Sequence, residues 1–157
     1  MVISEINFGQ LRDRLDSEFY SQQFLHTGEI LSNITSTTLD DLLEKIVRDP
    51  MGYGFSYVKQ GIPYYRVDDL QNPYLNDYKA VLISEKNHNK LKKTMLKYGD
   101  ILMAVRGSTI GRLALYYGKD FGGNISPNVI IMRLKKKELS AYVAVCLLSK
   151  FGKNQIN

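Results

Sequence analysis

The sequence LKYGDILMAVRGSTIGRLALYY, residues 96–117, is the most informative part of the chain about the fold, because it alternates short apolar runs with glycine-containing turns. Its apolar runs predict strands at residues 101–106 and 112–117. Gly107 and Gly111 lie between these runs and can adopt positive φ angles, so GSTIG predicts a hairpin turn. A phosphate-binding loop would instead end in Gly-Lys-Ser/Thr and precede a helix, and this stretch does neither.

Further strands are predicted by runs rich in β-branched and aromatic residues, at residues 62–67, 80–83 and 129–134. Helices are predicted by the apolar spacing, at residues 22–34, 38–46, 85–96 and 138–151. Thr38 and Ser84 are the expected N-caps of the second and third helices, and Gly152 is the expected C-cap of the last. Together these elements predict a mixed α/β (α+β) fold, a twisted, coiled set of short strands with flanking helices.

Composition excludes several classes of protein. The chain has 157 residues, of which 44% are hydrophobic and 24% charged, as is usual for a globular domain. It contains no apolar run of the roughly 18 residues that cross a bilayer, and its N-terminus does not resemble a secretory signal. The single cysteine, Cys146, excludes an internal disulfide and fits a reducing cytoplasm. We expect this thiol to be buried and unreactive in its apolar helix.

The charge is unevenly divided along the chain. Residues 1–50 carry a balance of −5, whereas residues 51–157 carry +10. A positive segment of this size attracts polyanions such as DNA, although lysines scattered for solubility would give the same count. Tyrosines interleaved with cations, among them Tyr57, suit either a nucleic-acid groove or amphipathic strands. From this segment we select three candidate DNA-binding residues: Lys59, Tyr64 and Arg66.

The residues needed for catalysis do not form a set. His26 and His88 lie far apart in the sequence, and no His/Cys cluster has metal-ligand spacing. The adjacent Asp68 and Asp69 would point to opposite faces of a strand, so they do not make an acid/base pair. Asp100 is expected to accept backbone N–H bonds in a turn. The sequence therefore predicts a chain that is not itself an enzyme and binds no metal or cofactor.

Three segments resemble the DNA-specificity subunits of type I restriction–modification systems, and their target recognition domains in particular. The first is SYVKQGIPYYRVDDL, residues 56–70, and the second combines the GDIL turn with the GSTIGR hairpin. The third is residues 128–134 with the following LLSKFG…QI helix. Their order and spacing together are fairly specific, and the resemblance covers residues 36–157.

The resemblance implies sequence-specific recognition of double-stranded DNA by a fold like that of a DNA methylase specificity domain. Separate modification subunits then methylate adenine with S-adenosylmethionine, and a restriction or translocase subunit can add cleavage. A second recognition domain or a homodimer is implied as a further partner. We expect residues 1–35 to be a lead-in, 36–137 the recognition domain and 138–157 the start of a longer conserved helix. An interaction module with exposed helices and an incidental basic face is the alternative.

Two kinds of DNA contact are expected from the remaining candidates. Arginine can contact guanine bidentately, asparagine can contact adenine, and hydroxyls reach bases or phosphates, although such residues also form ordinary turns. The candidates of this kind lie around the hairpin and before the last strand: Arg106, Ser108, Thr109, Arg112, Asn124 and Asn128. Phosphate contacts, or merely a solvated helix face, are expected of Lys86, Lys90, Lys92 and Lys93.

Overall fold

The computed structural model describes residues 22–34, 37–48 and 54–156. Its α-helices are α1 (Gln22–Ile34), α2 (Leu39–Leu42), α3 (Glu85–Lys90), α4 (Ser140–Leu148) and α5 (Lys150–Ile156). Its strands are β1 (Leu43–Val47), β2 (Ile62–Tyr65), β3 (Leu70–Gln71), β4 (Tyr74–Leu75), β5 (Val81–Ile83), β6 (Ile101–Ala104), β7 (Leu113–Leu115), β8 (Asn124–Ile125) and β9 (Val129–Leu134). The expected mixed α/β fold is confirmed.

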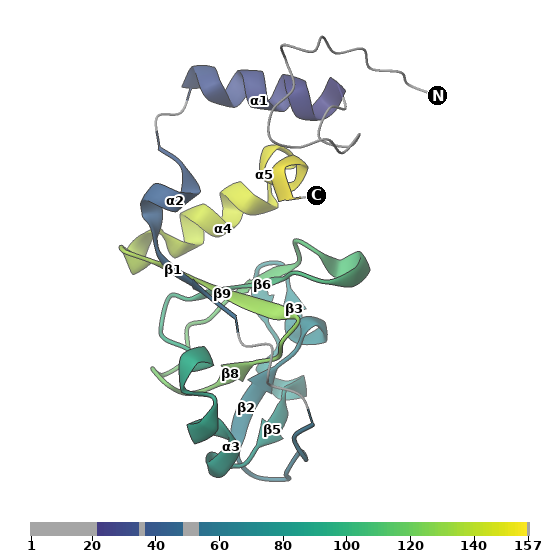
Figure 1. Ribbon diagram of the computed structural model, residues 1–157, viewed down its shortest axis with the longest axis vertical. Helices are drawn as coiled ribbons and strands as arrows, with labels where there is room; N and C mark the ends of the chain where they lie inside the picture. The colour runs from purple at the N-terminus through teal and green to yellow at the C-terminus, as the bar shows by residue number, and fades with distance from the viewer. Residues whose placement is uncertain (1–21, 35–36, 49–53, 157) are drawn as a thin grey trace.

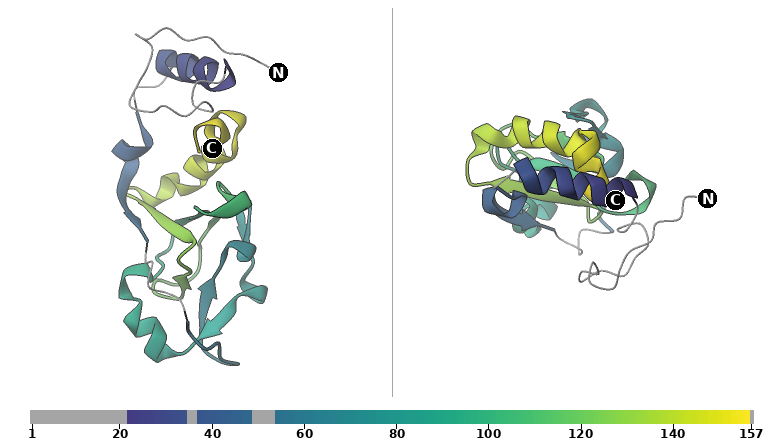
Figure 2. Two further views of the ribbon diagram at one scale, coloured as in Figure 1. Left: turned by 45° about the vertical axis from the view of Figure 1, so that its right-hand side comes forward. Right: turned by 90° about the horizontal axis from the view of Figure 1, so that it is seen from above.

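The strands form a four-stranded antiparallel sheet, in the order β1-β9-β6-β7, and a three-stranded sheet, in the order β5-β2-β8. In the smaller sheet β2 pairs antiparallel with β5 and parallel with β8. β3 and β4 make a separate two-stranded ribbon. The helices α1, α4 and α5 lie toward one end of the long axis, and α3 lies at the other (Figures 1 and 2).

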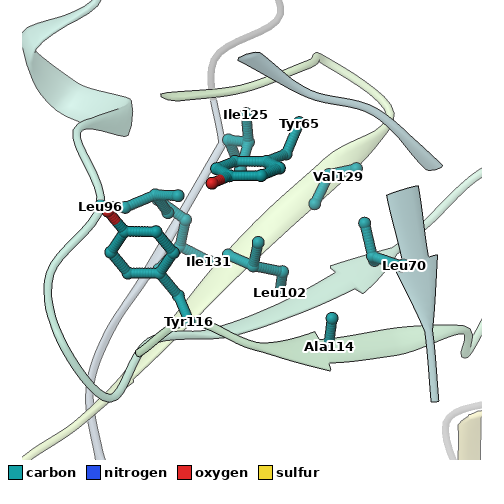
Figure 3. Close-up of a cluster of buried hydrophobic side chains, with 9 residues drawn as sticks. All are labelled: Tyr65, Leu70, Leu96, Leu102, Ala114, Tyr116, Ile125, Val129 and Ile131. Atoms are coloured by element: carbon teal, nitrogen blue, oxygen red, sulfur yellow. The ribbon is translucent and has the colours of Figure 1, made fainter. Parts of the chain in front are cut away.

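β9 is buried on both faces because it lies between two packed layers. Val129 and Ile131 face the smaller sheet and pack in one cluster with Tyr65 and Ile125, as Figure 3 shows. The alternate residues of β9 face the other way and pack against α4, where Val143 and Ala144 are buried. An uninterrupted run of large apolar residues is what burial on both faces requires.

The outer face of the smaller sheet is covered by the segment that contains α3. Tyr64 of β2, Ile83 of β5 and Leu91 form one buried cluster there. The layers therefore run from α4 through the two sheets to α3, which leaves the ends of the strands accessible for binding.

The hairpin and the main strands are confirmed. β6 and β7 pair antiparallel, and φ is +72° at Gly107 and +81° at Gly111. β2, β5 and β9 lie where strands were predicted, although β2 and the hairpin strands are shorter than expected. Asp100 accepts the backbone N–H of Lys97 at 2.7 Å, as a turn residue should.

Three predicted helices differ from those observed. The helix expected at residues 38–46 ends at Leu42, because residues 43–47 pair with β9 instead, and this pairing outweighs the local helical pattern. Thr38 caps the short α2 as expected. The helix at 85–96 is also shorter: α3 ends at Lys90 and a 3₁₀ turn follows at Lys92–Thr94.

The third difference is a break at Ser149, which divides the last predicted helix into α4 and α5. Ser149 has extended backbone angles, and its side chain accepts the N–H of Gly152 at 3.1 Å. Gly152 therefore lies inside α5 and is not a C-cap. Cys146 is exposed on α4, so the prediction of a buried thiol was wrong.

Candidate nucleic-acid interface

Two arginines meet at the loop between β8 and β9, residues 126–128. Arg48, which follows β1, donates from Nε to the carbonyl of Pro127 at 3.3 Å. The N–H of Ser126 donates to the carbonyl of Tyr65 at 2.8 Å, which places Arg66 beside the same loop. Chain segments far apart in sequence thus bring two cationic side chains to one place.

The predicted hairpin brings two more arginines to the same end of the four-stranded sheet. Val105 donates its N–H to the carbonyl of Asn128 at 3.0 Å, and Arg106 follows Val105 directly. Ala104 donates to the carbonyl of Arg112 at 2.8 Å. We call this end of the sheet the arginine edge, and it comprises Arg48, Arg66, Arg106 and Arg112.

A cleft of about 270 Å³ opens beside the arginine edge. Its lining combines aromatic rings, a guanidinium and polar loop residues: Gly54, Phe55, Tyr57, Tyr64, Arg66, Val67, Asp68, Ser126, Pro127 and Asn128. The ring of Tyr57 is about half exposed, and Phe55 meets Tyr64 edge-to-face at 6.3 Å between centroids. The cleft therefore offers hydrogen-bonding and stacking groups at once, as base recognition requires.

Arg66 is only loosely held at the cleft. Its backbone N–H donates to Asp69 at 2.8 Å, but its Nε lies 3.9 Å from the same carboxylate. This Nε is buried and has no hydrogen-bond partner among the described residues. Burial raises the pKa of Asp69, while the N–H and the charge of Arg66 oppose that rise. The Arg66 side chain as a whole is 38% exposed, so the exposed part of its guanidinium faces an acceptor bound in the cleft.

Two predicted contact residues, Tyr64 and Asn124, are buried in this structure, which does not suit direct contact with DNA. Tyr64 is 3% exposed and its ring packs beneath the cleft. Asn124 is 0% exposed and fixes the segment that follows α3: its amide nitrogen donates to the carbonyl of Leu91 at 3.0 Å and to the hydroxyl of Thr94 at 3.1 Å. Its amide oxygen lies 2.5 Å from Nδ1 of His88, so that Nδ1 is the donor.

The other candidates divide between opposite parts of the molecule and do not form one cluster. The four lysines after Ser84 are exposed on α3 and the turn that follows it, and Lys59 is exposed in the loop before β2. The hairpin tip instead lies beside α5, where a cleft of about 220 Å³ includes Ser108, Thr109 and Arg112. The structure thus separates α3, which carries lysines, from the four-stranded sheet that contains β6 and β9 (Figure 1).

Sequence reasoning missed Arg48 and did not choose Tyr57 as a site residue. Arg48 follows the segment that was expected to be helical, so nothing in the local pattern directed it to the loop at Pro127. Tyr57 belonged to the interleaved tyrosines, which was a usable signal.

Among residues 22–34, 37–48 and 54–156, no His, Cys, Asp and Glu side chains group as metal ligands. No helix of these segments is both long and apolar enough to cross a membrane.

Comparison with known proteins shows which fold this is. No protein-family model matches the sequence. The HsdS subunit from Thermoanaerobacter tengcongensis aligns with a TM-score of 0.50 and 14% identity, over 88% of this chain and 37% of that one. A second solved chain belongs to a structure described as showing complex assembly and conformational transition of the type I R-M system. It aligns with a TM-score of 0.51 and 14% identity, over 90% of this chain and 37% of that one. The chain therefore has the fold of a part of these type I proteins, about a third of each solved chain.

Sequence similarity agrees with the fold. The putative type I restriction enzyme MjaX specificity subunit of Methanocaldococcus jannaschii is 26% identical over an alignment of 144 residues, and this alignment covers 88% of the present chain. Its matched part is 34% of its own length, so the chain spans about a third of this relative. The resemblance that the GDIL and GSTIGR motifs predicted is confirmed.

Proposed function

We propose that this chain is a recognition domain of a type I specificity subunit that binds duplex DNA sequence-specifically at the arginine edge and the adjoining cleft. The observation that carries the proposal is the cleft, in which Arg66, whose side chain is 38% exposed, lies together with Tyr57 and Asn128. Arginine pairs bidentately with O6 and N7 of guanine in the major groove, and each such pair contributes about 1–3 kcal/mol of discrimination. The similarity to specificity subunits supports the same reading.

The remaining surface supplies affinity rather than sequence choice. The lysines of α3 are exposed and suit phosphate contacts, which position a protein on DNA without reading bases. Arg106 and Arg112 come from the hairpin and lie at the same end of the four-stranded sheet as the cleft that contains Arg66. Residues 36–137 make up the recognition domain in this proposal.

Catalysis belongs to other polypeptides in this proposal. Modification subunits methylate adenine, a restriction or translocase subunit adds cleavage, and a second recognition domain or another copy reads the other half of the site. The chain itself supplies no catalytic group and no cofactor.

The test is selection of binding sites from a randomised duplex library by the full chain, followed by titration of the selected duplex. We expect Arg66→Ala to weaken the selected duplex by about tenfold or more, and to affect random duplex much less. Lys150→Ala, which removes an exposed charge on α5, is the matched control. An unchanged preference in Arg66→Ala, or a library that yields no preferred sequence, would contradict the proposal.

Recruitment of a partner protein through exposed helices is the second candidate function. One observation favours it: α4 exposes Tyr142 and Val145 by 68% and 64%, although it is the most apolar helix. Charge reversal at Lys90, Lys92 and Lys93 separates the two. It abolishes DNA affinity and leaves assembly intact if the lysines bind phosphate, and it leaves DNA affinity unchanged if the basic face is incidental, as the second candidate requires.

A further inference from the structure

A pair of tyrosines with tilted rings in contact lies at the end of the four-stranded sheet opposite the arginine edge. Tyr98 precedes β6 and Tyr117 follows β7, and their ring centroids are 5.2 Å apart at an angle of 48°. The rings are 49% and 51% exposed. The backbone beneath them is paired, because Gly99 donates to the carbonyl of Tyr116 at 2.8 Å and Tyr116 donates to that of Asp100 at 2.9 Å. Two half-exposed aromatic rings thus lie on backbone that is held by hydrogen bonds.

Hollows lie on both sides of this pair. The cleft on the side of Tyr98 measures about 480 Å³ and is lined by both cations and carboxylates: Lys97, Arg133, Lys135, Lys136 and Lys137 beside Glu44, Asp100, Asp120 and Glu138. The cleft on the side of Tyr117 measures about 380 Å³ and includes a third exposed ring, Tyr74. The tyrosine pair is therefore a ridge between a hollow lined by charges of both signs and an aromatic hollow.

A fourth ring, Phe121, is exposed at a strained position. Its φ is +61°, an unusual angle for a bulky side chain, and its N–H donates to the carbonyl of Leu96 at 2.6 Å. Folding gains little from an exposed phenyl ring in a left-handed conformation, and such strain concentrates at functional positions. Lys97 Nζ lies 5.9 Å from the centre of this ring.

Cations accompany the rings, and the nearest carboxylates already have partners. Lys137 Nζ lies 5.5 Å from the centre of the Tyr98 ring. Asp100 is paired with Arg133, and Asp120 accepts the N–H of Tyr98 at 2.7 Å. Lys97 and Lys137 therefore lie beside the rings, where an anion that approaches the rings would meet them.

We propose that this tyrosine ridge, made of Tyr74, Tyr98, Tyr117 and Phe121 with Lys97 and Lys137, binds unpaired nucleotides of single-stranded DNA. Aromatic side chains interleaved with cations bind single strands because every base has a stacking face and every linkage a phosphate. A duplex hides its base faces, so the ridge selects single strand over duplex. The ridge lies at the start of β6 and the end of β9, whereas the arginine edge lies at the opposite ends of these strands, so this proposal does not depend on duplex recognition.

The test titrates the full chain with a fluorescein-labelled oligothymidylate and, in parallel, with a duplex of equal length at low salt. We expect the double variant Tyr98→Ala/Tyr117→Ala to weaken single-strand binding by at least about tenfold, since each stacked base contributes substantially. The double variant Tyr98→Phe/Tyr117→Phe keeps both rings and should stay within about twofold of the unaltered chain. Tyr142→Ala, an exposed tyrosine on α4, is the control for loss of a surface ring.

Photocrosslinking provides a readout that does not depend on folding of the alanine variant. An oligonucleotide with 5-iodouracil should crosslink the unaltered chain at Tyr98, Tyr117 or Phe121, and Arg66→Ala should leave this crosslink in place. Crosslinks that map elsewhere, or single-strand binding that is lost with Arg66→Ala, would assign the single strand to the arginine edge and overturn the proposal. Equal losses in the alanine and phenylalanine variants, or no binding of the oligothymidylate, would overturn it as well.

Discussion

Arg133 and Asp100 form a buried bidentate ion pair that joins β9 to the turn before β6. Nε of Arg133 lies 2.7 Å from one carboxylate oxygen and Nη2 lies 2.6 Å from the other. The hydrogen bonds to Asp100 raise the pKa of the Arg133 guanidinium above its ordinary value. Asp100 also accepts the N–H of Lys97, so the pair fixes the turn that carries Tyr98.

Removal of one partner should be strongly destabilising. Arg133→Met leaves Asp100 as a buried carboxylate without its cation, and we expect a loss of about 3–5 kcal/mol in the free energy of unfolding. Urea unfolding measures this loss in the free energy of unfolding. Glu44→Gln breaks an exposed pair with Lys45, at 3.7 Å, and should cost less than about 1 kcal/mol. A comparable small loss in both variants would show that the buried pair does not hold the turn.

Asp69 should give stability a pH dependence of definite sign. Burial raises its pKa, so the folded chain holds this proton more tightly than the unfolded chain. Protonated Asp69 therefore stabilises the folded chain. This contribution to the unfolding free energy is complete at pH values below 3.8, the ordinary pKa of an aspartate, and is lost as the pH rises through the pKa of Asp69 in the folded chain. Asp69→Asn removes this dependence while an amide oxygen still accepts the N–H of Arg66. We expect the unfolding free energy of Asp69→Asn, relative to the unaltered chain, to increase between pH about 4 and about 7.

Urea unfolding at several pH values measures this difference. Asp68→Asn is the matched control, because Asp68 is the exposed neighbour and its replacement should change stability by less than about 0.5 kcal/mol. A difference for Asp69→Asn that stays constant with pH, or declines, would show that hydrogen bonding outweighs burial at this carboxylate.

Local sequence signals predicted the parts of the fold that local interactions determine. Gly107 and Gly111 needed positive φ angles and have them, and the apolar run of β9 lies between two layers. The segment of β1 was mistaken for helix, since its strand state comes from pairing with β9 across 84 or more residues. Such pairing has no signal in the segment itself.

The candidate site was less accessible to sequence reasoning for the same reason. Whether a polar residue points outward depends on what packs over it, so Asn124 was taken for a contact residue although it anchors the segment after α3. The arginine edge is made by three separate segments meeting at Pro127 and Asn128. A charged residue within the apolar run of β9, Arg133, was the one signal of the buried pair that the sequence did contain.

Asn124 and Asn128 should separate stability from binding. Asn124→Ala leaves the carbonyl of Leu91 and Nδ1 of His88 without their buried partner, and we expect a loss of about 1–3 kcal/mol in unfolding free energy. Asn128→Ala lies in the cleft lining and should weaken the selected duplex with a stability change below about 1 kcal/mol. Urea unfolding and duplex titration on both variants measure the two effects. A stable Asn124→Ala that loses base preference would instead restore Asn124 as a contact residue.

The two hairpin glycines should respond differently to substitution, because their surroundings differ. At Gly107 nothing lies within 4 Å of an added Cβ, whereas at Gly111 it would lie 3.3 Å from Ile156 of α5. Gly107→Asn should be tolerated within about 1 kcal/mol, since asparagine adopts left-handed angles readily, and Gly107→Val should cost about 1–2 kcal/mol or more. Gly111→Ala should cost more than Gly107→Ala, because it strains the backbone and also presses on α5. Urea unfolding ranks the four variants, and equal losses for the two alanine variants would show that the hairpin tip does not pack on α5.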